Sequence, residues 1–289
     1  PFSLGSALLS TADQAASQAI GTKPSATAST GSGATDAGAS GGSDNPQIRT
    51  AKRLLATQER ILGTNHVFVA MSLRQLADLY ARDSKMTNAE PLLLRAVAIL
   101  ESTPDSEAKY LGDTLNMLAW VYQQTGAHSK ALPYLERALE IRQRVLGPNH
   151  SDTATSLNNL AEAYRELGAH AKAEPLYQRS LEIEEKLPRP NQASIAASLN
   201  NLGLLYQDKG EYAKAEAFFQ RALEIEEKFV GPASPQAAQT LNNMASLNVD
   251  KGAHAKAERL YRRSLELAEK IHGKTSRQVR RIHRPRRGK

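Results

Sequence analysis

The chain offers few residues whose type and spacing could support catalysis. Its one match to a nucleophile-serine motif, Gly38–Gly42 (GASGG), lies in low-complexity sequence, whereas that motif needs a preceding strand and a following helix. The paired glutamates 184–185 and 226–227 are predicted to be solvated helix faces rather than acid–base pairs. Cysteine is absent, and no metalloprotease, phosphate-loop or dinucleotide motif occurs. We therefore expect no enzymatic activity and no cofactor.

Three histidines share one position in a repeated pattern and could suggest a metal site. His128 and His170 are 42 residues apart, and His254 lies two such steps further on. Equivalent atoms of packed neighbouring helices are about 8–10 Å apart, whereas each ligand of a zinc ion lies about 2 Å from the metal. The spacing therefore predicts turn histidines and no metal centre.

The elements that carry these residues recur with a period of 42. The period is set by leucines at 73, 115, 157, 199 and 241, glycines at 126, 168, 210 and 252, and alanines at 89, 131, 173, 215 and 257. Three residue types that keep the same step indicate tandem copies of one structural unit.

Each copy has the pattern of two helices joined by a turn. The apolar side of the first helix in one copy is formed by Leu157, Leu160, Ala161 and Tyr164, which follow the i, i+3, i+4, i+7 spacing. Gly168 then predicts a helix end, and Ser151 with Asp152 predicts the N-terminal cap of that first helix. A second apolar stripe begins at Ala173. We expect an all-α protein in which stacked copies share a core.

The order of small, aromatic and glycine residues resembles a known repeat family. The series Ala161, Tyr164, Gly168, Ala173, Tyr177 and Ser180 resembles the tetratricopeptide repeat. The 42-residue step, with Leu-Asn-Asn-Leu-Ala at 157–161 and Leu-Gly-Pro-Asn-His at 146–150, resembles the kinesin light chain type. This resemblance implies a right-handed α-solenoid of helix–turn–helix repeats. It also implies a non-enzymatic scaffold that binds a protein or peptide segment in a concave groove.

The period and the composition together predict three parts of the chain. Residues 1–45 are rich in alanine, serine, glycine and threonine and are expected to be disordered. A repeat array is expected over 46–275, with a half repeat at 46–66 and full repeats at 67–108, 109–150, 151–192, 193–234 and 235–275. Residues 276–289 are predicted to be a basic tail.

The resemblance also indicates which positions face the groove, namely those one, five, eight and nine residues after the first leucine. The predicted peptide-binding residues are Asn116, Trp120, Asn158, Glu162, Arg165, Asn200, Gln207 and Asn242. An asparagine amide can donate to and accept from a peptide backbone, and tryptophan and arginine are enriched in binding hot spots. The favoured pocket combines Trp120, Asn158, Arg165 and Asn200. The alternatives are that the asparagines bond neighbouring helices and that Trp120 packs between helices.

The net positive charge of the chain comes from its C-terminal end. The chain has a net charge of +7, but nine basic and no acidic residues lie between Lys270 and Lys289, which leaves −2 on the rest. The tail arginines are Arg277, Arg280, Arg281, Arg284, Arg286 and Arg287. The tail could contact nucleic acid or anionic lipid, or serve only as a solubilising end, and the repeats could be the regulatory part of a larger protein. A cytoplasmic location is expected, with export left open.

Overall fold

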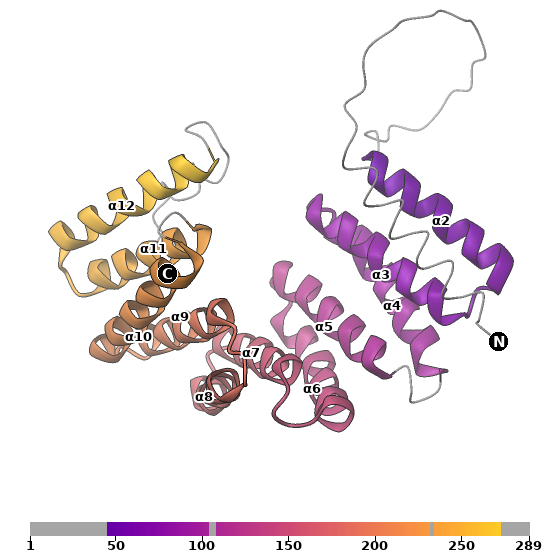
Figure 1. Cartoon of the computed structure of the whole chain (residues 1–289), viewed down its shortest axis with the longest axis horizontal. Helices are drawn as coiled ribbons and strands as arrows, with labels where there is room; N and C mark the ends of the chain where they lie inside the picture. Colours follow the sequence, from indigo (N-terminus) through magenta and orange to yellow (C-terminus); the bar gives the residue numbers. More distant parts are fainter. Residues whose placement is uncertain (1–44, 104–107, 232–233, 273–289) are drawn as a thin grey trace, which may run out of the picture. The chain divides into compact units, whose positions relative to one another are not determined.

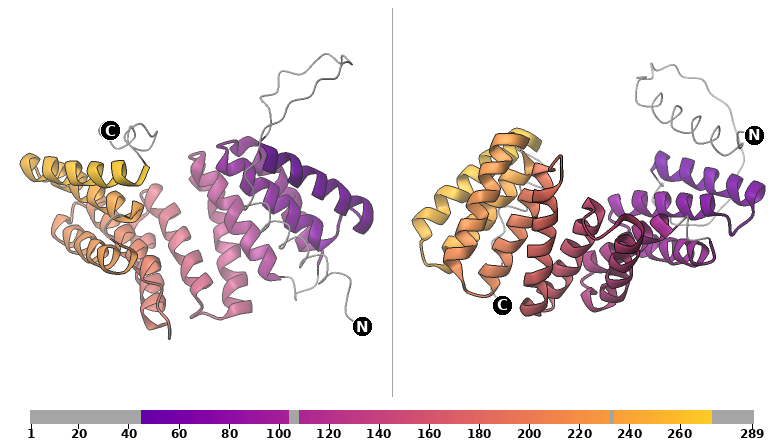
Figure 2. Two further views of the ribbon diagram at one scale, coloured as in Figure 1. Left: turned by 45° about the horizontal axis from the view of Figure 1, so that its top comes forward. Right: turned by 60° about the horizontal axis from the view of Figure 1, so that its bottom comes forward.

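The computed structural model describes residues 45–103, 108–231 and 234–272, and these form helices without a strand. Figure 1 shows the helices in chain order, and Figure 2 shows them from two further sides. The first helices of successive repeats are α3 (Val67–Arg82), α5 (Ala108–Gln124), α7 (Ser151–Glu166), α9 (Gln192–Asp208) and α11 (Pro235–Asp250). The second helices are α4 (Met86–Glu101), α6 (His128–Leu146), α8 (His170–Lys186), α10 (Tyr212–Ile225) and α12 (His254–His272). The helix α2 (Pro46–Leu62) precedes them, and a π-helical turn, η2 (Glu226–Val230), extends α10.

The helices pack as an all-α solenoid, in agreement with the predicted fold class. Every helix contacts the next one along the chain, and each first helix also contacts the first helix of the following repeat. In α7 the predicted apolar residues Leu157, Leu160 and Ala161 are buried, while Tyr164 is half-buried and donates its hydroxyl hydrogen to Glu136. The spacing of apolar residues therefore identified the packing side of this helix correctly.

A residue with positive φ lies in the turn of each described repeat. Gly126, Gly168, Gly210 and Gly252 have φ between 72° and 76°. In the first repeat the equivalent residue is Ser84, which adopts φ 60° although it carries a side chain. Glycine adopts this left-handed conformation at low cost, so the recurring glycine reflects the backbone geometry of the turn.

One glycine inside a first helix is required by a bulky neighbour. Gly203 of α9 occupies the position at which other repeats have alanine, and a Cβ atom there would lie 2.6 Å from the ring of Phe219 on α10. Phe219 is fully buried and occupies the position that Leu93 and Leu135 take in the first two repeats. The larger aromatic side chain is therefore accommodated by loss of a methyl group on the facing helix.

Two first helices are capped by histidine, and one of these caps differs from the sequence prediction. The N-cap of α7 is His150, whose Nδ1 accepts a hydrogen bond from the backbone N–H of Asp152 at 3.1 Å, and Ser151 is the first helical residue. His66 caps α3 in the same way through the N–H of Phe68. The prediction of Ser151 as cap was wrong because the imidazole, one residue earlier, reaches the free N–H.

Candidate functional site

The side of the solenoid formed by the polar positions of the first helices is continuous from repeat to repeat. We call it the first-helix face and define it by the residues one, five, eight and nine positions after the first leucine in α3, α5, α7, α9 and α11. Several bonds along this face join residues that are 43 apart, so one repeat is tied to the next. The eight predicted peptide-binding residues all belong to this face.

Three of the four predicted asparagines bind an asparagine of the following repeat. The side-chain oxygens of Asn116, Asn158 and Asn200 accept from the amides of Asn159, Asn201 and Asn243 at 3.3, 3.1 and 3.0 Å, respectively. We call these pairs the amide ladder. The alternative interpretation, in which these asparagines bond neighbouring helices, therefore holds for their oxygen atoms.

The remaining hydrogen-bonding capacity differs among the ladder asparagines. Asn116 is buried and donates its amide to the carbonyl of Gly112 and the hydroxyl of Ser156. The amide nitrogens of Asn158 and Asn200 make no hydrogen bond with the residues that the structure describes, and both side chains are half-buried. Those two amides can still donate to a ligand.

Arg165 is not a free ligand-binding group. Its side chain is only 8% exposed, and its guanidinium contacts Asp208 at 2.6 Å as well as the carboxylate of Glu166. In the next repeat the amide of Gln207 makes the equivalent bond to Asp250 at 2.6 Å. These contacts connect the C-terminal ends of α7, α9 and α11 and leave Arg165 to stabilise the array.

Trp120 is the predicted residue that remains most open to a partner. It is the only tryptophan of the chain and is 40% exposed on α5. Glu162, at the same position of the next repeat, is half-buried, and burial raises the pKa of its carboxyl although Arg165 opposes this shift. Within the favoured pocket, a ligand can thus contact the exposed part of Trp120 and the amide nitrogens of Asn158 and Asn200. Arg165 is occupied by its two carboxylate partners.

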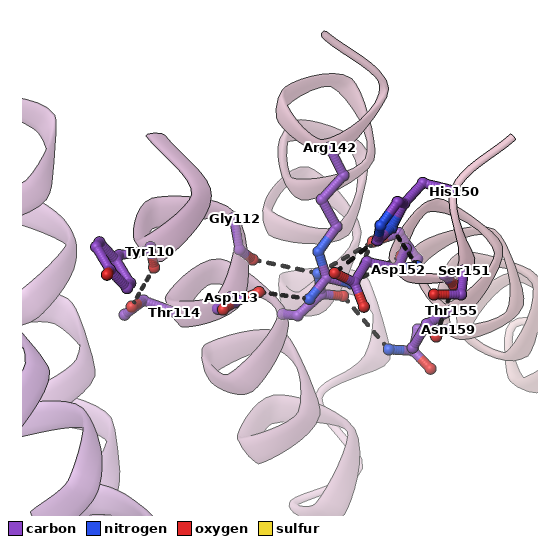
Figure 3. Close-up of polar contacts among 12 residues, drawn as sticks. Tyr110, Gly112, Asp113, Thr114, Arg142, His150, Ser151, Asp152, Thr155 and Asn159 are labelled. Carbon is purple, nitrogen blue, oxygen red and sulfur yellow. Dashed lines mark hydrogen bonds and ion pairs between the residues drawn. The ribbon is translucent and has the colours of Figure 1, made fainter. Parts of the chain in front are cut away.

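Sequence reasoning missed one position near the ends of the second helices, which carries a buried polar residue in three repeats, namely Arg142, Glu184 and Glu226. It recurs every 42 residues, with Gln58 and Leu100 at the two earlier copies, and we call it the junction position. Arg142 reaches Asp113 on α5 at 2.8 Å and, at the start of α7, the carbonyl of Asp152 and the hydroxyl of Ser156, both at 2.9 Å (Figure 3). One side chain therefore joins two successive repeats.

The two glutamates at this position correct the prediction of solvated glutamate pairs. Glu184 and Glu226 are each only 3% exposed, and in both carboxyls Oε2 has no hydrogen-bond partner in the described part of the chain. Burial raises the pKa of Glu184, with Asp152 adding to the effect, and raises the pKa of Glu226 to about 7. The sequence signal that could have indicated this burial is the 42-residue alignment of both glutamates with the apolar Leu100.

A cavity and the remaining predicted segments do not coincide with the first-helix face. A cavity of about 270 Å³ opens between α4, α5 and α6 beside Leu111 and Ile141, away from the predicted residues. The tail arginines and residues 1–44 lie outside the described residues. Within the described ranges no helix is long and apolar enough to cross a membrane, and no three metal-ligating side chains gather.

Comparison with known proteins identifies the repeat type. The tetratricopeptide repeat family model matches residues 69–144, 110–186 and 194–270. No curated protein sequence matches the chain. The crystal structure of BtubC (BKLC) from P. vanneervenii is 25% identical, covers 85% of this chain and 97% of that one, and has a TM-score of 0.63.

Two further crystal structures show the same fold. A putative kinesin light chain from Podosopora anserina with nearly identical TPR-like repeats is 25% identical, covers 72% of this chain and 98% of that one, and has a TM-score of 0.58. A Rap protein complexed with Competence and Sporulation Factor is 19% identical, covers 77% of this chain and 59% of that one, and has a TM-score of 0.63.

Proposed function

Because the chain belongs to the tetratricopeptide repeat family, with repeats of the kinesin light chain-like type, we propose that it binds a peptide segment of a partner protein on its first-helix face. The repeat fold is a typical non-enzymatic protein-interaction fold. The proposal adds to this general role a binding surface, the kind of ligand and the residues in contact with it.

The observation that carries the proposal is the exposed position of Trp120. A tryptophan that is 40% exposed among the polar side chains of α5 and α7 leaves a large apolar area in water. Burial of apolar surface contributes about 25 cal/mol per Å², and tryptophan is enriched among residues that dominate binding energies. Trp120 is therefore the anchor of the proposed site.

The amide ladder gives the asparagines a more specific role than the sequence suggested. Since the oxygens of Asn158 and Asn200 are used between repeats, their free amide nitrogens can only donate. An extended peptide supplies backbone carbonyls at regular intervals. We therefore assign Asn158 and Asn200 to peptide carbonyl contacts, each contributing about 0.5–1.5 kcal/mol.

One solved structure supports a bound ligand in this fold. The Rap protein was crystallised in complex with Competence and Sporulation Factor. At 19% identity this comparison carries the fold and none of the contact residues.

The proposal can be tested through the intrinsic fluorescence of Trp120. Peptides selected from a random library on the full chain should shift the emission of Trp120, since no other tryptophan contributes. Trp120→Ala, followed through a dye on the peptide because this variant has no tryptophan, should weaken their binding by more than about tenfold. The matched control is Phe229→Ala, which removes an aromatic side chain that is 55% exposed on η2. Equal effects of the two substitutions would show that peptides bind elsewhere.

A further inference from the structure

The two halves of the first-helix face differ in how their carboxylates are paired. In the N-terminal half Asp78 lies 2.7 Å from the guanidinium of Arg82, and Asp113 lies 2.8 Å from that of Arg142. Arg74 approaches the second oxygen of Asp113 at 3.4 Å. The acidic groups along α3 and α5 are therefore compensated within the protein.

In the C-terminal half, cations are scarce. A single guanidinium, that of Arg165, is shared by Glu166 and Asp208. Among the described residues Glu162 makes no ion pair, and Asp250 accepts only from the neutral amide of Gln207. The surface along α7, α9 and α11 thus carries negative charge that the protein does not neutralise.

Two buried carboxyls lie on α8 and η2, which contact α7, α9 and α11, and their burial favours the neutral form. Glu184 and Glu226 are 3% exposed, and each has an oxygen without a partner in the described part of the chain. Among charged groups, Asp152 on α7 faces Glu184, and Glu227 adjoins Glu226. Glu226 accepts from the hydroxyl of Thr240 on α11, which also lies 3.4 Å from the ladder oxygen of Asn200. An unpaired buried carboxylate is costly, and a nearby cation lowers that cost.

We propose that the C-terminal half of the first-helix face, along α7, α9 and α11, binds a peptide segment that carries lysine or arginine. This inference rests on the proposed function and specifies the chemistry of the ligand. The ligand's cationic groups lie opposite Glu162 and Asp250, where they also favour the charged form of the buried carboxyls, and an apolar residue of the same segment contacts Trp120. Acidic segments are repelled because the face offers them no unpaired cation within the described residues.

The test compares two labelled peptides on the full chain. Each has about 12 residues, enough to pass the three helices when extended, with lysine at every third position in one and glutamate in the other. The remaining residues are glycine and alanine. At low ionic strength the lysine peptide should bind, the glutamate peptide should not, and added salt should weaken the complex.

Variants that break no ion pair locate the binding surface. Glu162→Gln, Glu184→Gln and Asp250→Asn together should weaken binding of the lysine peptide by about tenfold, since each surface charge pair contributes modestly. The matched control, Glu140→Gln, Glu224→Gln and Glu266→Gln, removes the same charge from exposed positions of second helices and should change binding less than about twofold. The double variant Glu162→Gln with Asp250→Asn, which retains Glu184, should also weaken binding of the lysine peptide, but less. It keeps the test valid if the triple variant unfolds.

The outcomes separate this inference from the proposed function. Equal weakening by the two triple variants, or no binding of the lysine peptide, would overturn the charge preference. If library-selected peptides still depended on Trp120 in that case, the proposed function would stand without it. If neither the charge preference nor the dependence on Trp120 were observed, both the inference and the proposed function would be overturned.

Discussion

Two junctions in this solenoid are built on the same position but with opposite charge. Arg142, between the second and third full repeats, has a carboxylate, a carbonyl and a hydroxyl as partners. Glu226, two repeats later, has only the hydroxyl of Thr240. Both side chains are buried, at 8% and 3% exposure.

The difference teaches that repeats with equal folds need not have equal energetics. The guanidinium of Arg142 pairs with Asp113 and donates to Ser156, so it connects α5, α6 and α7. Glu226 lacks a cation, and its burial favours the neutral carboxyl. The backbone period conserves the geometry of the junction, while the residue placed there decides whether the junction responds to pH.

The largest expected effect is on the Arg142 junction. Arg142→Leu installs the residue that the first repeat has at this position, Leu100, but leaves Asp113 without its main partner. Because Arg142 is buried and Asp113 is half-buried, the cost should lie between that of a surface pair and that of a buried pair, at about 2 kcal/mol. We expect the free energy of unfolding, measured with urea, to fall by about that amount.

A second substitution shows whether the loss comes from the unpaired carboxylate. The residue equivalent to Asp113 in the first repeat is Met71. Asp113→Met in the Arg142→Leu background should restore most of the lost stability, because the junction then has the residues of its neighbour. If the double variant were as unstable as the single one, the charge pair would not explain the effect.

A smaller effect, with a clear pH dependence, is expected at Glu226. Burial raises the pKa of this carboxyl from 4.5 to about 7. A carboxyl with a higher pKa in the folded state stabilises the fold fully below the ordinary pKa, and this contribution is lost as the pH rises through 7. Glu226→Gln should therefore be more stable than the parent chain by about 1–2 kcal/mol above about pH 8, and the gain should vanish near about pH 5.

Thermal or urea unfolding across this pH range checks the expectation. Glu224→Gln, on the exposed side of α10, is the matched control and should keep the parent pH profile. If Glu224→Gln and Glu226→Gln raised the free energy of unfolding equally at high pH, the cause would be general charge repulsion and not the burial of Glu226.

The smallest expected effect concerns the amide ladder. Asn201→Ala removes the donor to Asn158 and should lower the free energy of unfolding by about 1 kcal/mol. Asn242→Ala is the control, because Asn242 makes no hydrogen bond with the described residues, and it should leave stability within about 0.5 kcal/mol. Equal losses in urea unfolding would mean that the ladder bond contributes nothing specific.

The sequence predicted the helices because their signals are local. The leucines of α7 and the turn glycines follow spacings that depend on one helix and its own end. The cap at His150 was missed because serine, next to it, has the stronger general preference.

The site was harder to predict because its bonds join residues 43 apart, while the repeat is 42 residues long. An alignment by repeats places Asn158 beside Asn200, whereas the actual partner of Asn158 is Asn201. The same offset joins Arg165 to Asp208. An exposed polar position and an inter-repeat position look alike in one sequence, and only the stacking of helices distinguishes them.

The constant offset of the amide ladder also has a consequence for how such a gene can change length. If residues 151–192 were removed as one block, Asn201 would take the place of Asn159 opposite Asn116, and Ser198 would take that of Ser156 beside Arg142. The asparagine pair and the hydroxyl beside Arg142 would then be supplied by the equivalent residues of the next repeat. Unequal crossing-over within this reading frame can therefore shorten or lengthen the first-helix face by whole repeats while the contacts between neighbouring repeats are kept.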